Sequence, residues 1–136
     1  MTQRWLISPS SRPDRSLDIV RIVVALVLSV HSIFRIIDGD VAGFGGFLAS
    51  IGFPLGVALA WFITLATLAS SVALIIRRLV VPACICHIIV LLAGIFLDHI
   101  HDGWFVVGGG RNGMEYSVVL ITCLFAVLWS YWPRKQ

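Results

Sequence analysis

Four ionisable side chains stand where they could act together on a ligand or a proton. His31 and Arg35 are four positions apart and therefore share one face if their segment is helical. Asp98 and Glu115 lie at the beginning and near the end of a polar stretch, residues 98–117, in an otherwise apolar region. Histidine and carboxylic acid groups transfer protons, and arginine donates hydrogen bonds to carbonyl oxygens. We therefore take His31, Arg35 and Glu115 as candidate catalytic residues.

The polar stretch also supplies side chains that could contact a bound ligand. The candidate ligand-binding residues are Asp98, His99, Arg111, Asn112 and Tyr116. His99 and His101 are of the right type to bind a metal ion. Their His-x-His spacing is nevertheless common on solvated loops, so we predict a solvated interfacial loop and assign no metal site.

Three glycines in the same stretch match a nucleotide-binding pattern by their spacing. Gly108, Gly110 and Gly113 form G-x-G-x-x-G, which in dinucleotide-binding proteins belongs to a strand–helix–strand unit. The apolar segment that follows is instead a candidate membrane span. We therefore expect these glycines to let a loop turn tightly, and we predict no nucleotide binding.

The composition of the chain is that of a membrane protein. Hydrophobic residues make up 59% of the 136 residues and charged residues 12%, whereas soluble domains average about 45–50% and about 25%. A soluble helical bundle would need polar outer faces, which the apolar segments lack. The formal net charge of +3 is too small to indicate binding to nucleic acid.

Four apolar segments are each near the roughly 20 residues that a helix needs to cross a bilayer. They cover about residues 19–37, 53–76, 79–97 and 114–132. We predict an all-α integral membrane protein with four transmembrane helices in an antiparallel bundle. The Gly-rich segment "DGDVAGFGGFLASIG" is expected to be a loop, and Pro54 is expected at the start of the second helix. Arg77 and Arg78 form a very short turn between the second and third helices, which should therefore be antiparallel neighbours.

The basic residues define an orientation. If the chain crosses the membrane four times, one side carries Arg4, Arg12, Arg15, Arg77, Arg78, Arg134 and Lys135. The positive-inside rule assigns that side to the cytoplasm. We therefore predict a multi-pass membrane protein with cytoplasmic tails at 1–16 and 133–136 and a transmembrane domain at 17–132; the resemblance described below implies that the membrane is the bacterial inner membrane. Arg21 is expected either to reach the interface or to pair with Asp18.

This orientation places His31, Arg35, Asp98 and Glu115 in one layer, in the outer half of the membrane. Charged groups at such depths usually face a bundle interior or a cavity. One interpretation is a polar chamber that holds a ligand, with the polar stretch as its lid. The other is a structural layer in which Arg35 forms an ion pair with Glu115 or Asp98. The residues alone leave both interpretations open.

Several motifs, in their order and spacing, resemble the DoxX family of small four-helix bacterial membrane proteins. Arg21 enters the first span, and "HSIFR" follows at residues 31–35. The segments "FGGFLASIGFPLGVALAW" and "DGWFVVGGGRNGMEYSVVLI" are similar to the family's Gly-Phe-Pro entry to the second helix and to its Gly-rich loop ending in Glu. This chain has Thr64 and Thr67 where the family often has a Glu within the second helix.

Because members of that family are linked to membrane redox complexes, the resemblance implies a membrane subunit of a quinone-linked complex. His31, Arg35 and Glu115 would then hold a quinone head group or relay protons to it, and a redox partner protein would supply electrons. The alternatives are a non-catalytic anchor or assembly module and a small-molecule permease, which the lack of a visible inverted repeat disfavours. Besides the lipid bilayer, the expected partners are that redox protein or a second copy of the chain.

Overall fold

The computed structural model describes residues 13–133, and in that range the chain folds into helices without any strand. The α-helices are α2 (Pro13–Ile37), α3 (Val41–Ser50), α4 (Gly56–Ile75), α5 (Val80–Leu97) and α6 (Glu115–Tyr131), with a short 3-10 turn, η1 (His99–His101). The all-helical prediction is confirmed for these residues. The predictions for the tails at 1–12 and 134–136 lie outside the described residues, as do Arg4, Arg12, Arg134 and Lys135.

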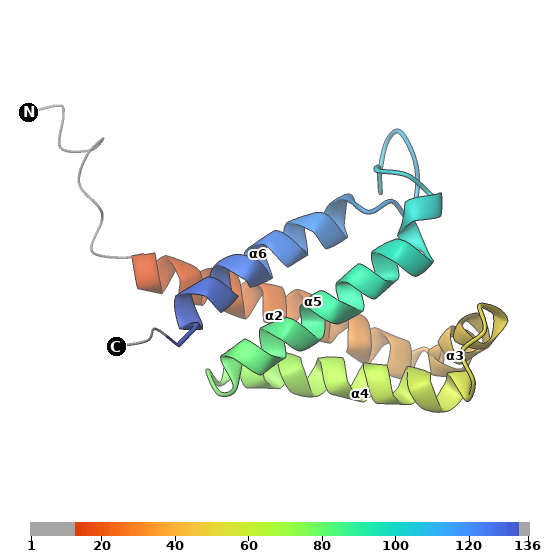
Figure 1. Ribbon diagram of the computed structural model, residues 1–136, viewed down its shortest axis with the longest axis horizontal. Helices are drawn as coiled ribbons and strands as arrows, with labels where there is room; N and C mark the ends of the chain where they lie inside the picture. Colours follow the sequence, from red (N-terminus) through yellow and green to blue (C-terminus); the bar gives the residue numbers. More distant parts are fainter. Residues whose placement is uncertain (1–12, 134–136) are drawn as a thin grey trace, which may run out of the picture.

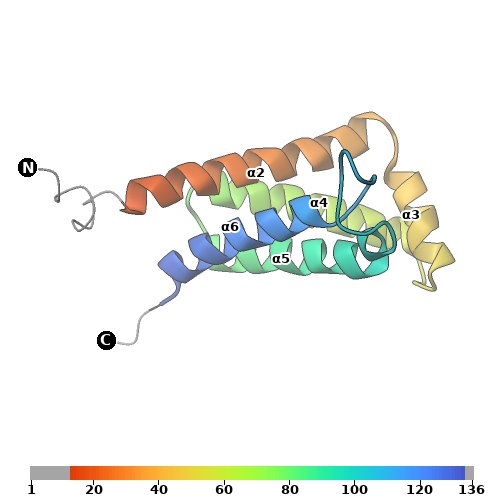
Figure 2. The same cartoon turned by 90° about the horizontal axis from the view of Figure 1, so that it is seen from above.

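Helices α2, α4, α5 and α6 pack around one apolar core (Figures 1 and 2). In both views they run in alternating directions, so two ends of the molecule can be named. The start of α2 and the end of α6 lie at what we call the Arg77 end, with the α4–α5 turn. The end of α2, α3, η1 and the following loop lie at the opposite Arg35 end. Helix α4 packs against α5, which confirms the neighbours predicted from the Arg77–Arg78 turn.

Three of these helices are long and apolar enough to cross a membrane: residues Arg15–Ile37 of α2, all of α4 and all of α5. Their outward faces carry large apolar side chains, among them Phe62, Ile89 and Phe96, each more than 60% exposed. A helix facing water would place polar residues there. Helix α6 is also apolar but has 17 residues and is shorter than these three.

The predicted loop between the first two spans was wrong, because residues 41–50 form the helix α3. Val41 and Leu48 of α3 are buried against Ala60 of α4 in a second apolar cluster. Gly45 allows this close approach, since a Cβ atom at that position would lie 2.6 Å from the Cα atom of Val57. Packing on α4 therefore stabilises a helix that three glycines would otherwise disfavour.

Backbone hydrogen bonds close the ends of α2, α3 and α4 in the same way. At each end a residue with positive φ follows the helix: Gly39 after α2, Gly52 after α3 and Arg77 after α4. Its N–H and the next N–H bond back to carbonyls of the last turn, which is the Schellman motif. Helix α4 begins at Gly56, after a left-handed Leu55. The prediction that Pro54 lies at the start of the helix was thus wrong by two residues, since Pro54 belongs to the preceding turn.

Candidate functional site

The side chain of Arg35 contacts two neutral partners and lies within electrostatic range of the carboxylate of Asp40. It is half-buried in the last turn of α2, and its Nη1 donates a hydrogen bond of 3.4 Å to the hydroxyl of Thr64 in α4. Its guanidinium carbon lies 4.3 Å from the ring centroid of Phe44 in α3, in cation–π geometry. Arg35 therefore lies where α2, α3 and α4 meet.

His31 lies one helical turn before Arg35 and is exposed. It is within electrostatic range of Arg35 and of His99, which belongs to η1 beyond α5. His31 and Arg35 are therefore two basic groups close to each other at one end of the bundle. Their spacing of four positions predicted this shared face.

The predicted ion pair of Arg35 with Glu115 or Asp98 is not formed. Among the side chains of residues 15–133, the ion pairs are Arg21–Asp18, Arg77–Asp18 and His99–Asp98. The carboxylate of Glu115 instead accepts a hydrogen bond of 2.8 Å from the backbone N–H of Val106. The loop before α6 folds back onto that carboxylate, and the sequence does not reveal that path.

The same loop is closed by backbone hydrogen bonds. The N–H groups of residues 113, 114 and 115 donate to the carbonyls of Phe105, Gly103 and Trp104, respectively. Gly113 is buried, and a Cβ atom there would lie 2.6 Å from the nitrogen of Phe105. This glycine is therefore needed for close backbone contact and has no nucleotide-binding context, since no strand is present in residues 13–133.

Asn112 joins the two ends of η1 to the loop. Its side-chain amide nitrogen donates to Asp98 at 3.2 Å and to Asp102 at 2.8 Å. Its backbone carbonyl oxygen lies 2.9 Å from Nδ1 of His99. Asn112 adopts φ 57°, a left-handed conformation that asparagine tolerates well. Three of the candidate ligand-binding residues, Asp98, His99 and Asn112, are thus brought together.

The other two candidate ligand-binding residues do not join this network. Arg111 and Tyr116 are exposed, and no hydrogen bond or ion pair ties their side chains to the described residues. No group of three His, Cys, Asp or Glu residues in residues 13–133 is arranged to hold a metal ion.

A line of polar side chains along α4 was not predicted as part of the site. The buried residues of α4 follow one another at intervals of three and four positions, and the hydroxyl-bearing ones are Thr64, Thr67 and Ser71. Thr67 bonds the hydroxyl of Ser32 in α2 at 2.9 Å, and Ser71 bonds Nε2 of buried His87 in α5 at 3.2 Å. The regular spacing of the hydroxyls is the sequence signal that would have found this line.

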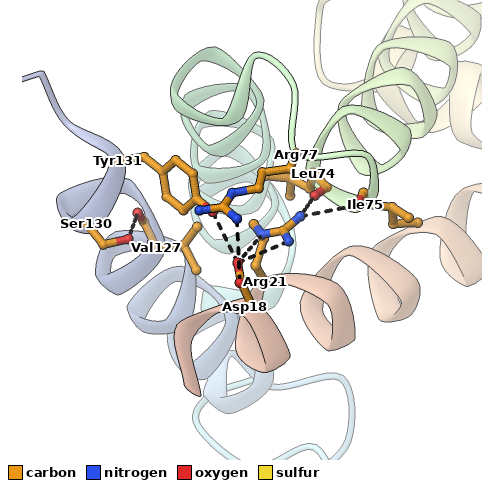
Figure 3. Close-up of polar contacts among 8 residues, drawn as sticks. All are labelled: Asp18, Arg21, Leu74, Ile75, Arg77, Val127, Ser130 and Tyr131. Atoms are coloured by element: carbon orange, nitrogen blue, oxygen red, sulfur yellow. Dashed lines mark hydrogen bonds and ion pairs between the residues drawn. The ribbon is translucent and has the colours of Figure 1, made fainter. Parts of the chain in front are cut away.

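A second polar cluster ties the helices together at the Arg77 end (Figure 3). One carboxylate oxygen of Asp18 accepts hydrogen bonds of 3.1 Å from Arg21 and from the hydroxyl of Tyr131 in α6. The other lies 3.9 Å from Arg77. Arg21 is 4% exposed and also donates to the carbonyls of Leu74 and Ile75. Of the two expectations for Arg21, pairing with Asp18 is therefore confirmed.

Comparison of the chain with protein-family models, with curated proteins and with solved structures finds no match. The site has to be interpreted from its own chemistry. A guanidinium group carries five N–H donors, and the one acceptor bonded to Arg35 in the described chain is a hydroxyl. No fully buried side-chain nitrogen in that part of the chain lacks a partner, so the remaining donors of Arg35 are accessible. Such donors can bond an acceptor oxygen.

Proposed function

We propose that the protein is an integral membrane protein of the DoxX type, with α2, α4, α5 and α6 crossing the bacterial inner membrane. The apolar surfaces of the three long helices support a membrane location. Helix α6 has 17 residues, about 25 Å at 1.5 Å per residue, and Trp132 beyond its end could extend the span into the aromatic interface. Arg77 and Arg78 in the α4–α5 turn favour a cytoplasmic Arg77 end, with both termini on that side.

We further propose that the Arg35 end binds the head group of a quinone, as the membrane subunit of a redox complex. The observation that carries this proposal is the half-buried Arg35, whose hydrogen-bond and ring partners are Thr64 and Phe44. The carboxylate of Asp40 lies within electrostatic range but forms no hydrogen bond or ion pair with it among the described residues. Donors left unbonded near the hydrocarbon region are costly, so an acceptor is favoured there. A quinone carbonyl oxygen has the right chemistry, and its apolar tail would lie among lipid chains.

Arg35, His31 and Glu115 have different roles in this proposal. Arg35 holds the carbonyl oxygen, and exposed His31 is the group that exchanges protons with the medium. Electrons come from a redox partner protein. We give Glu115 a structural part in this proposal, since its carboxylate accepts a hydrogen bond from the backbone of Val106.

A quinone titration of purified protein in detergent, followed by thermal unfolding, tests this function. We expect a saturable rise in the melting temperature with the wild type and no rise with Arg35→Gln. Arg78→Gln is the matched control, since Arg78 is an exposed arginine at the opposite end. An equal rise in Arg35→Gln, or no rise in the wild type, would refute a quinone site at Arg35.

A second function, a non-catalytic assembly module, is favoured by one observation. Asp98, Asn112 and Glu115, three of the candidate site residues, are engaged in hydrogen bonds that close their own loop. In that case the polar end is structural, and the Arg35 variant would melt earlier with or without quinone. Quinone titration of the wild type distinguishes the two functions.

A further inference from the structure

The loop between η1 and α6 exposes its apolar side chains. Trp104 and Phe105 are each 50% exposed and Val107 is 71% exposed, and Ile100 of η1 is exposed beside them in sequence. We call these four residues the apolar tip. Soluble surfaces rarely gather two aromatic and two branched side chains within eight positions, and such a patch indicates contact with a partner or a membrane.

The polar groups of the same loop are turned toward each other. Asn112 bonds Asp98 and Asp102, and the carboxylate of Glu115 bonds the N–H of Val106. The carbonyls of residues 103, 104 and 105 accept backbone hydrogen bonds from the three residues around Met114. The loop thus satisfies much of its polar backbone and side-chain chemistry internally, which lowers the cost of moving it into less polar surroundings.

The helices on either side of the loop also expose apolar side chains near it in sequence. Phe96 in the last turn of α5 is 64% exposed, and Val119 in the first turns of α6 is 59% exposed. Arg111, at the end of the glycine run, is exposed and carries the charge that lipid phosphates bind. Tryptophan and arginine are both favoured at the level of the lipid head groups.

We propose that the apolar tip inserts into the lipid interface at the Arg35 end, with Arg111 on the lipid phosphates. The polar stretch is then a membrane-embedded cap over the Arg35 end and is not a solvated lid. This inference rests on the proposed membrane location and is independent of quinone binding. It assigns the apolar tip to lipid, whereas a second copy of the chain or another protein would be a different occupant.

Fluorescence quenching of Trp104 in vesicles of phosphatidylcholine and phosphatidylglycerol tests the insertion. A chain that keeps Trp104 as its single tryptophan, with phenylalanine at positions 5, 61, 129 and 132, is reconstituted with lipids brominated at different acyl depths. We expect loss of Trp104 emission with bromine near the head group, a smaller loss with deep bromine, and weak quenching by iodide in the water phase.

A matched chain that keeps Trp61 as its single tryptophan is the control. Trp61 lies within α4 and is 42% exposed, so deep bromine should quench it if α4 spans the bilayer. Quenching of Trp61 without quenching of Trp104 by brominated lipid would overturn the insertion while leaving the membrane span intact. If brominated lipid quenches neither Trp61 nor Trp104, the proposed membrane location itself is wrong.

Two further measurements separate lipid insertion from misfolding and from burial of the apolar tip by protein. Circular dichroism tests whether the single-tryptophan chains keep their helices. If they lose them, the emission of Trp104 is obtained instead as the difference between the wild type and Trp104→Phe. If neither brominated lipid nor iodide reaches Trp104, protein covers the apolar tip, and the lipid assignment is wrong. Replacing Arg111 with Gln should weaken quenching more in vesicles that contain phosphatidylglycerol than in phosphatidylcholine alone, because only the former lipid carries a net negative charge at its phosphate.

Discussion

The guanidinium group of Arg21 donates a hydrogen bond to the carbonyl oxygen of Leu74, 53 positions later in the chain, at the C-terminal end of α4. The same group bonds the carbonyl of Ile75 and the carboxylate of Asp18. The last carbonyls of a helix lack partners within the helix, and a cation there also complements the helix dipole. Arg21 thus completes the end of α4 from within α2.

Replacing Arg21 with Met should destabilise the fold by about 2–3 kcal/mol, because charge-assisted hydrogen bonds to the end of α4 are lost in a buried place. Unfolding in detergent, followed by circular dichroism, measures this change. Arg78→Met removes an exposed arginine from the adjoining turn and should change little. Equal stability of the Arg21 and Arg78 variants would show that Arg21 does not fasten the helices.

The turn after α4 makes a separate prediction for Arg77, which adopts φ 59°. A residue with a Cβ atom is strained there by about 1–2 kcal/mol, and glycine is not. Arg77→Gly and Arg77→Ala both lose the contacts with Asp18 and Tyr131, yet the Gly variant should be the more stable by about 1 kcal/mol. Parallel denaturation curves decide the order; an Ala variant at least as stable as Gly would contradict this backbone conformation.

Two adjacent glycines of α3 should respond to alanine in opposite directions. A Cβ atom at Gly45 would lie 2.6 Å from the backbone of Val57, whereas one at Gly46 meets nothing within 4 Å. Gly45→Ala should cost about 1–3 kcal/mol by forcing α3 away from α4. Gly46→Ala should gain up to about 1 kcal/mol, as alanine favours a helix. Thermal unfolding of the pair checks this, and similar effects from both would contradict the packing of α3.

The bond from Val106 predicts how Glu115 responds to substitution. Glu115→Gln keeps an acceptor oxygen for the N–H of Val106 and should leave the loop closed. Glu115→Ala leaves that N–H without its partner and should destabilise the loop by about 1 kcal/mol. Protease cleavage within residues 103–112 reports loop opening. Equal cleavage of the Gln and Ala variants would show that the carboxylate has another partner.

The apolar segments predicted most of the long helices closely, since the length and composition of a segment depend on local sequence. The second span was expected at 53–76 and the helix covers Gly56–Ile75; the third was expected at 79–97 and the helix covers Val80–Leu97. Helix α3 was missed because glycine favours loops by local propensity. Its stability depends on contact with Val57, which is a feature of tertiary packing.

In the candidate site, too, the local relationships were predicted and the tertiary contacts were not. The shared face of His31 and Arg35 follows from their spacing of four, and the pairing of Arg21 with Asp18 follows from a spacing of three. One of the two interpretations left open by the sequence paired Arg35 with the carboxylate of Glu115 or Asp98. The structure gives it Thr64 and Phe44 instead, and these contacts depend on where α3 and α4 pack.

The most direct test of the quinone site is photoaffinity labelling with an azidoquinone, followed by peptide mapping. We predict labels at the end of α2 and the start of α4, which excess quinone abolishes. We also predict that Arg35→Gln loses these labels and that Glu115→Gln keeps them. Labels that persist in Arg35→Gln, or that excess quinone does not displace, would contradict a quinone site at Arg35.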